Sequence, residues 1–132
     1  MFISKIIEKN SNKDKGDAEK ACTEMIMVKE AIERLKGHED KTVVVLEKDS
    51  KNYMLVGGGK DGKYIVTALS KGKKYVAANK YAVPKPEVEL FIEGKTESYP
   101  AKRVLNLEMT LEAAKQYAHR GALAQVFDWE VI

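Results

Sequence analysis

Residues 53–67 read YMLVGGGKDGKYIVT, and the glycine-rich centre of this stretch decides the fold. Its spacing matches two nucleotide-binding loops, G-x-G-x-x-G and G-x-x-x-x-G-K, although a tyrosine stands where the second needs Ser or Thr for Mg²⁺. Both loops hold phosphate at the N-terminus of a following helix. Here the flanking residues are aromatic and β-branched on both sides, which favours two strands. We therefore expect an antiparallel hairpin whose turn lysines, Lys60 and Lys63, face solvent.

Short runs of strand-forming residues continue on both sides of this hairpin, with turn residues between them. Pro84 and Pro86 indicate a crossing loop over residues 80–86, because proline cannot donate a hydrogen bond within a sheet. The predicted strands cover residues 42–47, 53–56, 63–69, 74–78 and 88–92, a stretch near 101–105, and a final strand at 126–131 with Phe127 and Trp129 on one face.

Two segments have the three-and-four spacing of an amphipathic helix. The first runs from Asp17, a potential N-cap, to Gly37, a potential C-terminal residue, over about 19 residues. The second begins at Thr110 as its cap and ends at His119-Arg120-Gly121, where basic residues and glycine suit a helix C-terminus. Apolar positions on the two helices are Ala18, Ala21, Cys22, Met25, Val28, Ile32 and Leu35, then Leu111, Ala114, Tyr117 and Ala118.

These elements predict an α+β fold in one domain over residues 1–132. We expect a single antiparallel twisted sheet of about six to seven strands, with the long N-terminal helix and the C-terminal helix packed on it. Such an arrangement covers one sheet face with helices and leaves the other free for a partner.

The composition indicates a globular chain, with 44% hydrophobic and 33% charged residues among 132. The apolar runs are far shorter than the roughly 18 residues that a membrane helix needs. The N-terminus has too short an apolar region for a secretory signal, so we expect a cytoplasmic location. Cys22 is the only cysteine, which excludes an intrachain disulfide.

The sequence offers little chemistry for an enzyme. His38, His119 and Cys22 are scattered over different elements and lack the close spacing of metal ligands. His119 fits a surface residue at a helix end, and Cys22 fits a small core residue; the competing interpretation makes either one catalytic. We predict no catalytic residues, no metal site and no cofactor, and hence a protein that is not an enzyme.

The basic segment Lys60–Lys85 supports an alternative function. It holds seven lysines against one acid, and Tyr64 and Tyr75 lie beside some of them. Cations next to aromatic rings are typical of modules that bind single-stranded nucleic acid. Lysines also keep hairpin tips soluble and protect sheet edges, so both interpretations stay open.

The acidic strand that follows suggests a protein partner instead. Alternation over Val88–Ile92 buries every second residue and places Glu87, Glu89, Phe91 and Glu93 on the other face. An exposed phenylalanine among carboxylates is suited to a basic partner, since charge steers the encounter and the ring anchors it. The simpler alternative is a solvated face with Phe91 covered by a helix.

The chain resembles the type one Imm immunity-protein family of bacterial polymorphic toxin systems. One matching block is the strand, glycine turn and strand over residues 53–67. The other is similar to the closing helix, glycine and Trp-containing strand of the family, through Val104, Leu111, Ala114, Tyr117, Gly121 and Trp129. Ala124 departs from an expected proline, and Tyr117 replaces the usual phenylalanine.

This resemblance implies a small, non-catalytic antitoxin that binds a cognate toxin domain and occludes its active site. Nucleic-acid deaminases are among the toxins associated with the family. Neither a membrane nor a small-molecule substrate is expected as a partner. The matching motifs are structural, so they do not carry over a toxin-contact site.

Overall fold

The computed structural model describes residues 1–10, 16–36, 41–80 and 87–132. The expected crossing loop lies almost wholly on residues 81–86, outside the described residues. The elements in chain order are β1 (Lys5–Asn10), β2 (Ala18–Ala21), α1 (Met25–Glu33), β3 (Lys41–Asp49), β4 (Asn52–Gly58), the 3₁₀ turn η1 (Lys60–Gly62), β5 (Tyr64–Ser70), β6 (Lys73–Asn79), β7 (Val88–Ile92), β8 (Lys95–Tyr99), the 3₁₀ turn η2 (Ala101–Arg103), α2 (Leu107–Arg120) and β9 (Phe127–Val131).

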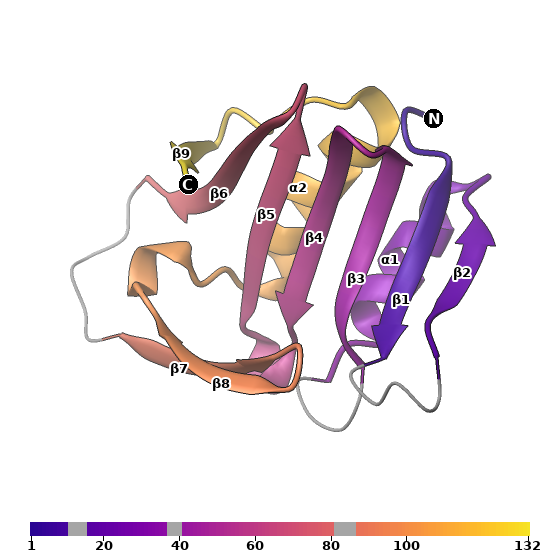
Figure 1. Ribbon diagram of the computed structural model, residues 1–132. Coiled ribbons are helices and arrows are strands. Elements are labelled where there is room, and N and C mark those ends of the chain that lie inside the picture. Colours follow the sequence, from indigo (N-terminus) through magenta and orange to yellow (C-terminus); the bar gives the residue numbers. More distant parts are fainter. Residues whose placement is uncertain (11–15, 37–40, 81–86) are drawn as a thin grey trace.

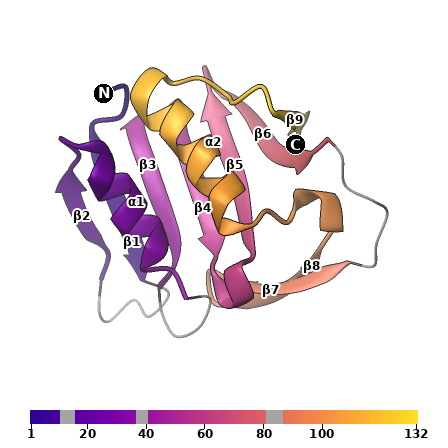
Figure 2. The same cartoon turned by 180° about the vertical axis from the view of Figure 1, so that it is seen from behind.

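Two helices cover one face of an antiparallel sheet, as the opposite views in Figure 1 and Figure 2 show. Within the described residues this sheet has seven strands in the order β2-β1-β3-β4-β5-β6-β9, and β7 pairs only with β8. The α+β class and the antiparallel sheet are thus confirmed. The expectation of a single sheet is corrected, because the acidic strand forms a hairpin of its own.

The main core lies between the sheet and the helices. Alternate residues of each central strand point toward the helices and are fully buried, as strand geometry requires. Tyr117 of α2 is the largest side chain at this centre. Neither helix in the described part of the chain is long and apolar enough to cross a membrane. The strand residues with 0% exposure are Ile6, Val44, Leu46, Met54, Val56, Val66 and Ala77.

The glycine-rich stretch is a hairpin turn between β4 and β5, as predicted. Gly59 N–H donates to the carbonyl of Lys63 across the turn at 2.8 Å, and Lys60 and Lys63 are exposed. Gly58 has φ +104°, which L-residues rarely adopt. The glycines therefore serve to turn the backbone back on itself, and no helix follows to hold a phosphate.

The predicted helix over residues 17–37 is wrong in its first half. Ala18–Ala21 form the edge strand β2 beside β1, and α1 spans only nine residues. Lys5 Nζ binds a Glu19 carboxylate oxygen at 2.7 Å, and Asp17 accepts from Asn10 N–H at 2.9 Å instead of capping a helix. Pairing with β2 satisfies the backbone N–H and C=O groups on the outer edge of β1. The spacing of apolar residues in the sequence does not reveal this requirement.

The second half of that helical stripe is confirmed. Val28 and Ile32 are buried on α1, and Leu35 is buried just beyond it. Gly37, the expected C-terminal residue, lies outside the described residues. Strand β1 was not predicted at all, although Ile6 is fully buried at its centre.

Two boundaries near α2 also differ from the prediction. Residues 101–103 form the 3₁₀ turn η2, and Leu105 makes only an isolated bridge to Tyr64; the strand is β8, just upstream. Helix α2 begins one turn early, because Asn106 caps it by accepting from Met109 N–H at 2.8 Å. Thr110 is buried inside the helix and donates to the carbonyl of Asn106. The predicted cap at Thr110 is therefore wrong, because asparagine is at least as good a cap as threonine and Asn106 lies one turn earlier.

The segment from β7 to η2 is fastened to the last strand by a charge cluster. Glu130 of β9 accepts from Lys102 Nζ at 2.7 Å and from Arg103 Nε at 2.8 Å. The hydrogen bond from Lys102, and then that from Arg103, lowers the pKa of this carboxyl. A depressed folded pKa contributes stability above the unfolded pKa, about 4.3 for glutamate, and that stability is lost as pH falls through the folded value.

We expect Glu130→Gln to destabilise the protein at pH 7 by about 1 kcal/mol, the scale of a partly exposed ion-pair network. The gap between wild type and variant should close toward pH 3, where the wild-type carboxyl is protonated as well. Urea denaturation at the two pH values measures this, with Asp128→Asn on the same strand as the control. A gap of equal size at both pH values would contradict the assignment.

Candidate partner interface

The β7–β8 hairpin presents the predicted acidic face. Val88, Leu90 and Ile92 point inward, as predicted, and Leu90 is only 3% exposed. Glu89 and Phe91 lie on the opposite face of the strand; Glu89 is exposed and Phe91 is half-buried. Glu87, just before the strand, is exposed too. The structure thus brings Glu87, Glu89 and Phe91 onto one surface of the hairpin.

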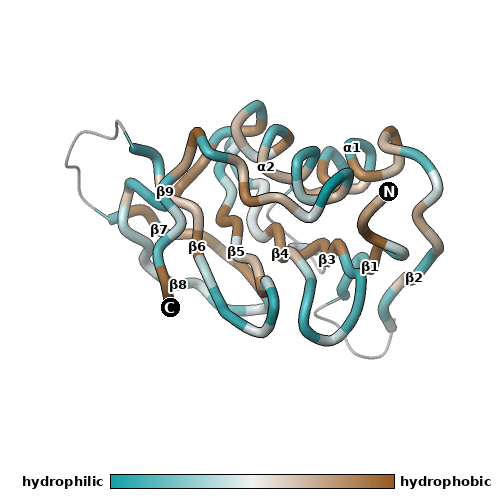
Figure 3. The backbone as a smooth tube through the Cα atoms, turned by 90° about the horizontal axis from the view of Figure 1, so that it is seen from above, coloured by the Kyte–Doolittle hydropathy of each residue, from teal (hydrophilic) through white to brown (hydrophobic). Residues whose placement is uncertain are grey.

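A second, smaller core holds this hairpin against the sheet. Leu90 packs with Ile65 of β5 and Val76 of β6, which point away from the helices. Figure 3 shows the helices on one side of the strands and the hairpin toward the other. Both helices therefore lie on the far side of the sheet from Phe91, so the alternative in which a helix covers this ring is wrong.

Gly57 permits the close approach of the hairpin. A Cβ atom at this position would lie 2.9 Å from Cγ2 of Ile92, nearer than real contacts allow. The glycine stretch thus has a second role besides turning the chain, since it makes room for the inner face of β7. That role depends on a contact between residues 35 positions apart and was not visible in the sequence.

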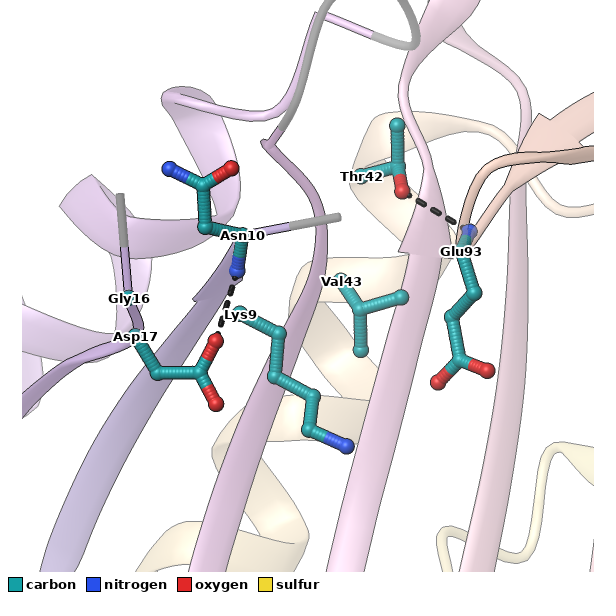
Figure 4. A pocket seen from close by; sticks show the side chains of 7 residues that line it. All are labelled: Lys9, Asn10, Gly16, Asp17, Thr42, Val43 and Glu93. Carbon is teal, nitrogen blue, oxygen red and sulfur yellow. Dashed lines mark hydrogen bonds between the residues drawn. The ribbon is translucent and has the colours of Figure 1, made fainter. Parts of the chain in front are cut away.

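Glu93 departs from the predicted surface because the chain turns there. It has φ +52°, and its N–H donates to Thr42 Oγ1 at 2.9 Å. Figure 4 shows Glu93 beside the pocket that Lys9, Asp17 and Val43 also line, with a volume of about 450 Å³. The backbone of Glu93 thus joins the hairpin to Thr42 near the start of β3.

The acidic character of the hairpin affects a neighbouring phenol. Burial raises the pKa of Tyr99, and the carboxylates of Glu97 and Glu93 raise it further. This tyrosine packs against the second core and remains protonated at neutral pH. The hairpin and its turn therefore concentrate negative charge on one side of the molecule, with Lys95 as the cation of its turn.

The basic segment offers less for nucleic acid than its composition indicates. Lys60, Lys63, Lys71 and Lys73 are exposed, but Tyr64 is only 4% exposed and faces the main core. A buried ring cannot stack on a base. Tyr75 is half-buried with Lys73 Nζ at 5.9 Å from its ring centre, so one cation–aromatic pair lies at the surface within the described part of the segment, residues 60–80.

Comparison with protein families now adds to this geometry. The model of the family described as Immunity protein Imm1 matches residues 27–130. The chain belongs to the Imm1 family. No curated protein matches it. The resemblance proposed from residues 53–67 and from the C-terminal block is thus confirmed.

The Imm1 match extends from α1 to β9 and contains the glycine turn, the acidic hairpin and α2. Strands β1 and β2 precede it, so the match spans five of the seven strands of the large sheet. Membership places the chain among immunity proteins, which is the class indicated by its sequence.

Of the residues considered for catalysis in this Imm1 chain, Cys22 and His119 are described, and they lie in different parts of the fold. Cys22 is buried between β2 and α1, and burial raises the pKa of its thiol. His119 is exposed in the last turn of α2, as predicted, and His38 lies outside the described residues. Within the described ranges, no group of three His, Cys, Asp or Glu side chains is placed to hold a metal ion.

Proposed function

We propose that this protein is the antitoxin of a bacterial polymorphic toxin system, which binds its cognate toxin domain and occludes the active site. The match to the Imm1 family over residues 27–130 is the observation that carries this proposal. Inhibition then requires buried surface and no chemistry. A standard complex of this kind buries about 1,600 Å² in total.

We further propose that the toxin acts on nucleic acid, with a deaminase as the class to test first. Enzymes that bind nucleic acid present basic grooves to neutralise phosphate. The surface formed by Glu87, Glu89 and Phe91, with Glu93 at its border, is complementary to such a groove, because carboxylates steer the encounter and an aromatic ring anchors it. This charge complementarity supports the acidic hairpin as part of the contact.

The direct test is to purify the chain together with the toxin domain encoded beside its gene. We expect a one-to-one complex by light scattering and loss of the toxin's activity in proportion to the complex formed. A folded pair that remains separate at micromolar concentration would refute the proposal. Binding of the free chain to single-stranded DNA at about 50 mM salt would instead favour the nucleic-acid alternative.

Reversing charge on the hairpin should slow complex formation. For Glu87→Lys combined with Glu89→Lys we expect an association rate about tenfold lower at low ionic strength, with a small change in dissociation, because exposed charges act mainly on encounter. The difference should shrink at about 150 mM salt, where the screening length is about 8 Å.

Surface plasmon resonance at two salt concentrations provides the measurement. The matched control is Glu108→Lys combined with Glu112→Lys, since both glutamates are exposed on α2, on the other side of the sheet. An equal loss of association rate in the two double variants would show an effect of net charge alone. An unchanged rate in the hairpin variant would remove the hairpin from the contact.

A further inference from the structure

The face of the large sheet that points away from the helices carries a row of three aliphatic residues that ends in a threonine. Strand register aligns Ile7, Val45, Leu55 and Thr67 across β1, β3, β4 and β5. We call these four residues the open strip; Figure 1 looks onto this face, with both helices behind the strands. Among the described segments, the one that packs on this face is the chain from β7 to η2, which contacts Ile65 and Val76 of β5 and β6 and reaches Gly57 of β4.

The open strip is less buried than the row on the other face of the same strands. Ile7, Leu55 and Thr67 remain partly exposed and Val45 is 6% exposed, whereas Ile6, Leu46 and Met54 have 0% exposure. In an antiparallel sheet with one face exposed to solvent, apolar residues on the buried face normally alternate along each strand with polar residues on the exposed face. Here the outward positions at the centre of the sheet are aliphatic, so this face has the character of an interface.

Polar and charged side chains border the open strip on both sides. Toward one end, the next row contains Lys5, whose Nζ lies 3.1 Å from a Glu47 carboxylate oxygen, and then Tyr53 and Leu69. Toward the other end, the hairpin packs over Gly57 and Ile65 in the next row, and Lys9 and Glu93 line a pocket at the end of that row. An apolar centre within a polar rim is the usual anatomy of a protein interface.

The acidic hairpin adjoins the open strip directly. Thr67, at the end of the strip, pairs with Val76, which the hairpin buries. The strip has one outward residue on each of four strands about 4.8 Å apart, and each residue occupies two positions of about 3.4 Å along its strand, so it covers about 130 Å² of sheet. A stable complex buries about 800 Å² on each partner. The strip is therefore too small alone, and the hairpin beside it is the surface that can complete an interface.

We infer that the open strip and the adjoining acidic hairpin form one contact surface for the toxin, and that the toxin presents an apolar protrusion bordered by basic side chains. This inference rests on the proposed function and names the part of the partner that is recognised. In this complex the apolar residues of the toxin's protrusion contact Leu55 and the other residues of the open strip. Its basic residues meet Glu89 and Glu93, whose carboxylates are exposed at the border.

Arginine substitutions on the open strip test this surface. Leu55→Arg should weaken the affinity for the toxin domain at least 100-fold, because it places a cation at the apolar centre, opposite basic residues. Thr67→Arg is a second variant at a partly exposed position, and we expect at least a tenfold loss. Isothermal titration calorimetry gives the affinity, and circular dichroism with urea denaturation verifies that each variant is folded.

The matched control is Ile26→Arg on α1. Ile26 is 48% exposed and lines an apolar groove between α1 and α2, so it offers a comparable site on the opposite face. We expect its affinity to change less than threefold. Loss of binding in Ile26→Arg with full binding by Leu55→Arg and Thr67→Arg would overturn the inference and assign the toxin to the helical face.

The outcomes separate this inference from the proposed function. If wild type does not bind the toxin domain, the proposed function fails. If wild type binds and both strip variants bind equally well, only the inference fails. A second copy of this chain is the alternative occupant of the open strip, and sedimentation of each protein alone tests for it. If the wild type is a dimer, Leu55→Arg is a monomer and toxin binding is unchanged, the inference is also overturned.

Discussion

Replacing Tyr117→Ala should destabilise the protein by about 3–5 kcal/mol, the range for truncating a large buried aromatic side chain. Tyr117 has 0% exposure in the main core, and its ring meets the ring of Phe2 edge to face with centroids 5.5 Å apart. Its hydroxyl donates to the carbonyl of Leu69 at 3.2 Å. The substitution removes the ring that joins α2 to both the N-terminus and β5.

The size of this loss matters because domains are stable by only about 5–15 kcal/mol. Urea denaturation should show a lower midpoint with an unchanged slope. The control is Tyr117→Phe, which keeps the ring and removes one hydrogen bond, at about 1 kcal/mol. Burial raises the pKa of this phenol, so the hydroxyl remains a donor at neutral pH. Equal losses in the two variants would show that the hydroxyl, and not the ring, stabilises the core.

Gly58→Ala should cost about 3–5 kcal/mol, although it adds a single methyl group. Two penalties combine: φ +104° is strained for any L-residue, at about 1–3 kcal/mol, and the new Cβ would meet the Lys63 carbonyl oxygen at 2.6 Å. That oxygen is backbone and already accepts from Gly59 N–H, so it cannot move aside cheaply. A local overpacking of this kind adds about 1–3 kcal/mol.

Gly62→Ala is the matched control in the same turn. Gly62 also has a positive φ, +68°, but nothing lies within 4 Å of the position its Cβ would take. Only the left-handed strain remains, about 1–2 kcal/mol. The free energies of unfolding of the two variants, from thermal or urea denaturation, should therefore differ by about 1–4 kcal/mol. Indistinguishable stabilities would mean that the contact with Lys63 relaxes without cost.

The candidate interface was predictable where it depended on neighbouring residues. Alternation along β7 correctly separated buried Leu90 from outward Glu89, because successive residues of a strand point to opposite faces. The position of Glu93 was not predictable, since it follows from a turn and from a hydrogen bond to Thr42, 51 residues away. Whether the surface contacts a toxin remains a prediction for the binding experiments.

The open strip illustrates a different limit. Its members could each be assigned an outward direction from their strands, but the sequence does not state which face the helices will cover. That choice is made by the crossovers between strands, and by the hairpin that packs against Ile65 and Val76 on the second face. Contacts between distant segments therefore determine which apolar residues remain accessible.

By itself, the sequence determined the α+β class, the glycine hairpin over residues 53–67, the stripe of α2 and the family. The first three depend on backbone preferences and on periods of two or 3.6 residues, which are local, and the family followed from the resemblance of residues 53–67 and of the C-terminal block. Tertiary structure alone decided that Ala18–Ala21 would be a strand, because the open edge of β1 needs hydrogen-bond partners. It also decided that Gly57 would leave room for Ile92, since only folding brings those two residues together.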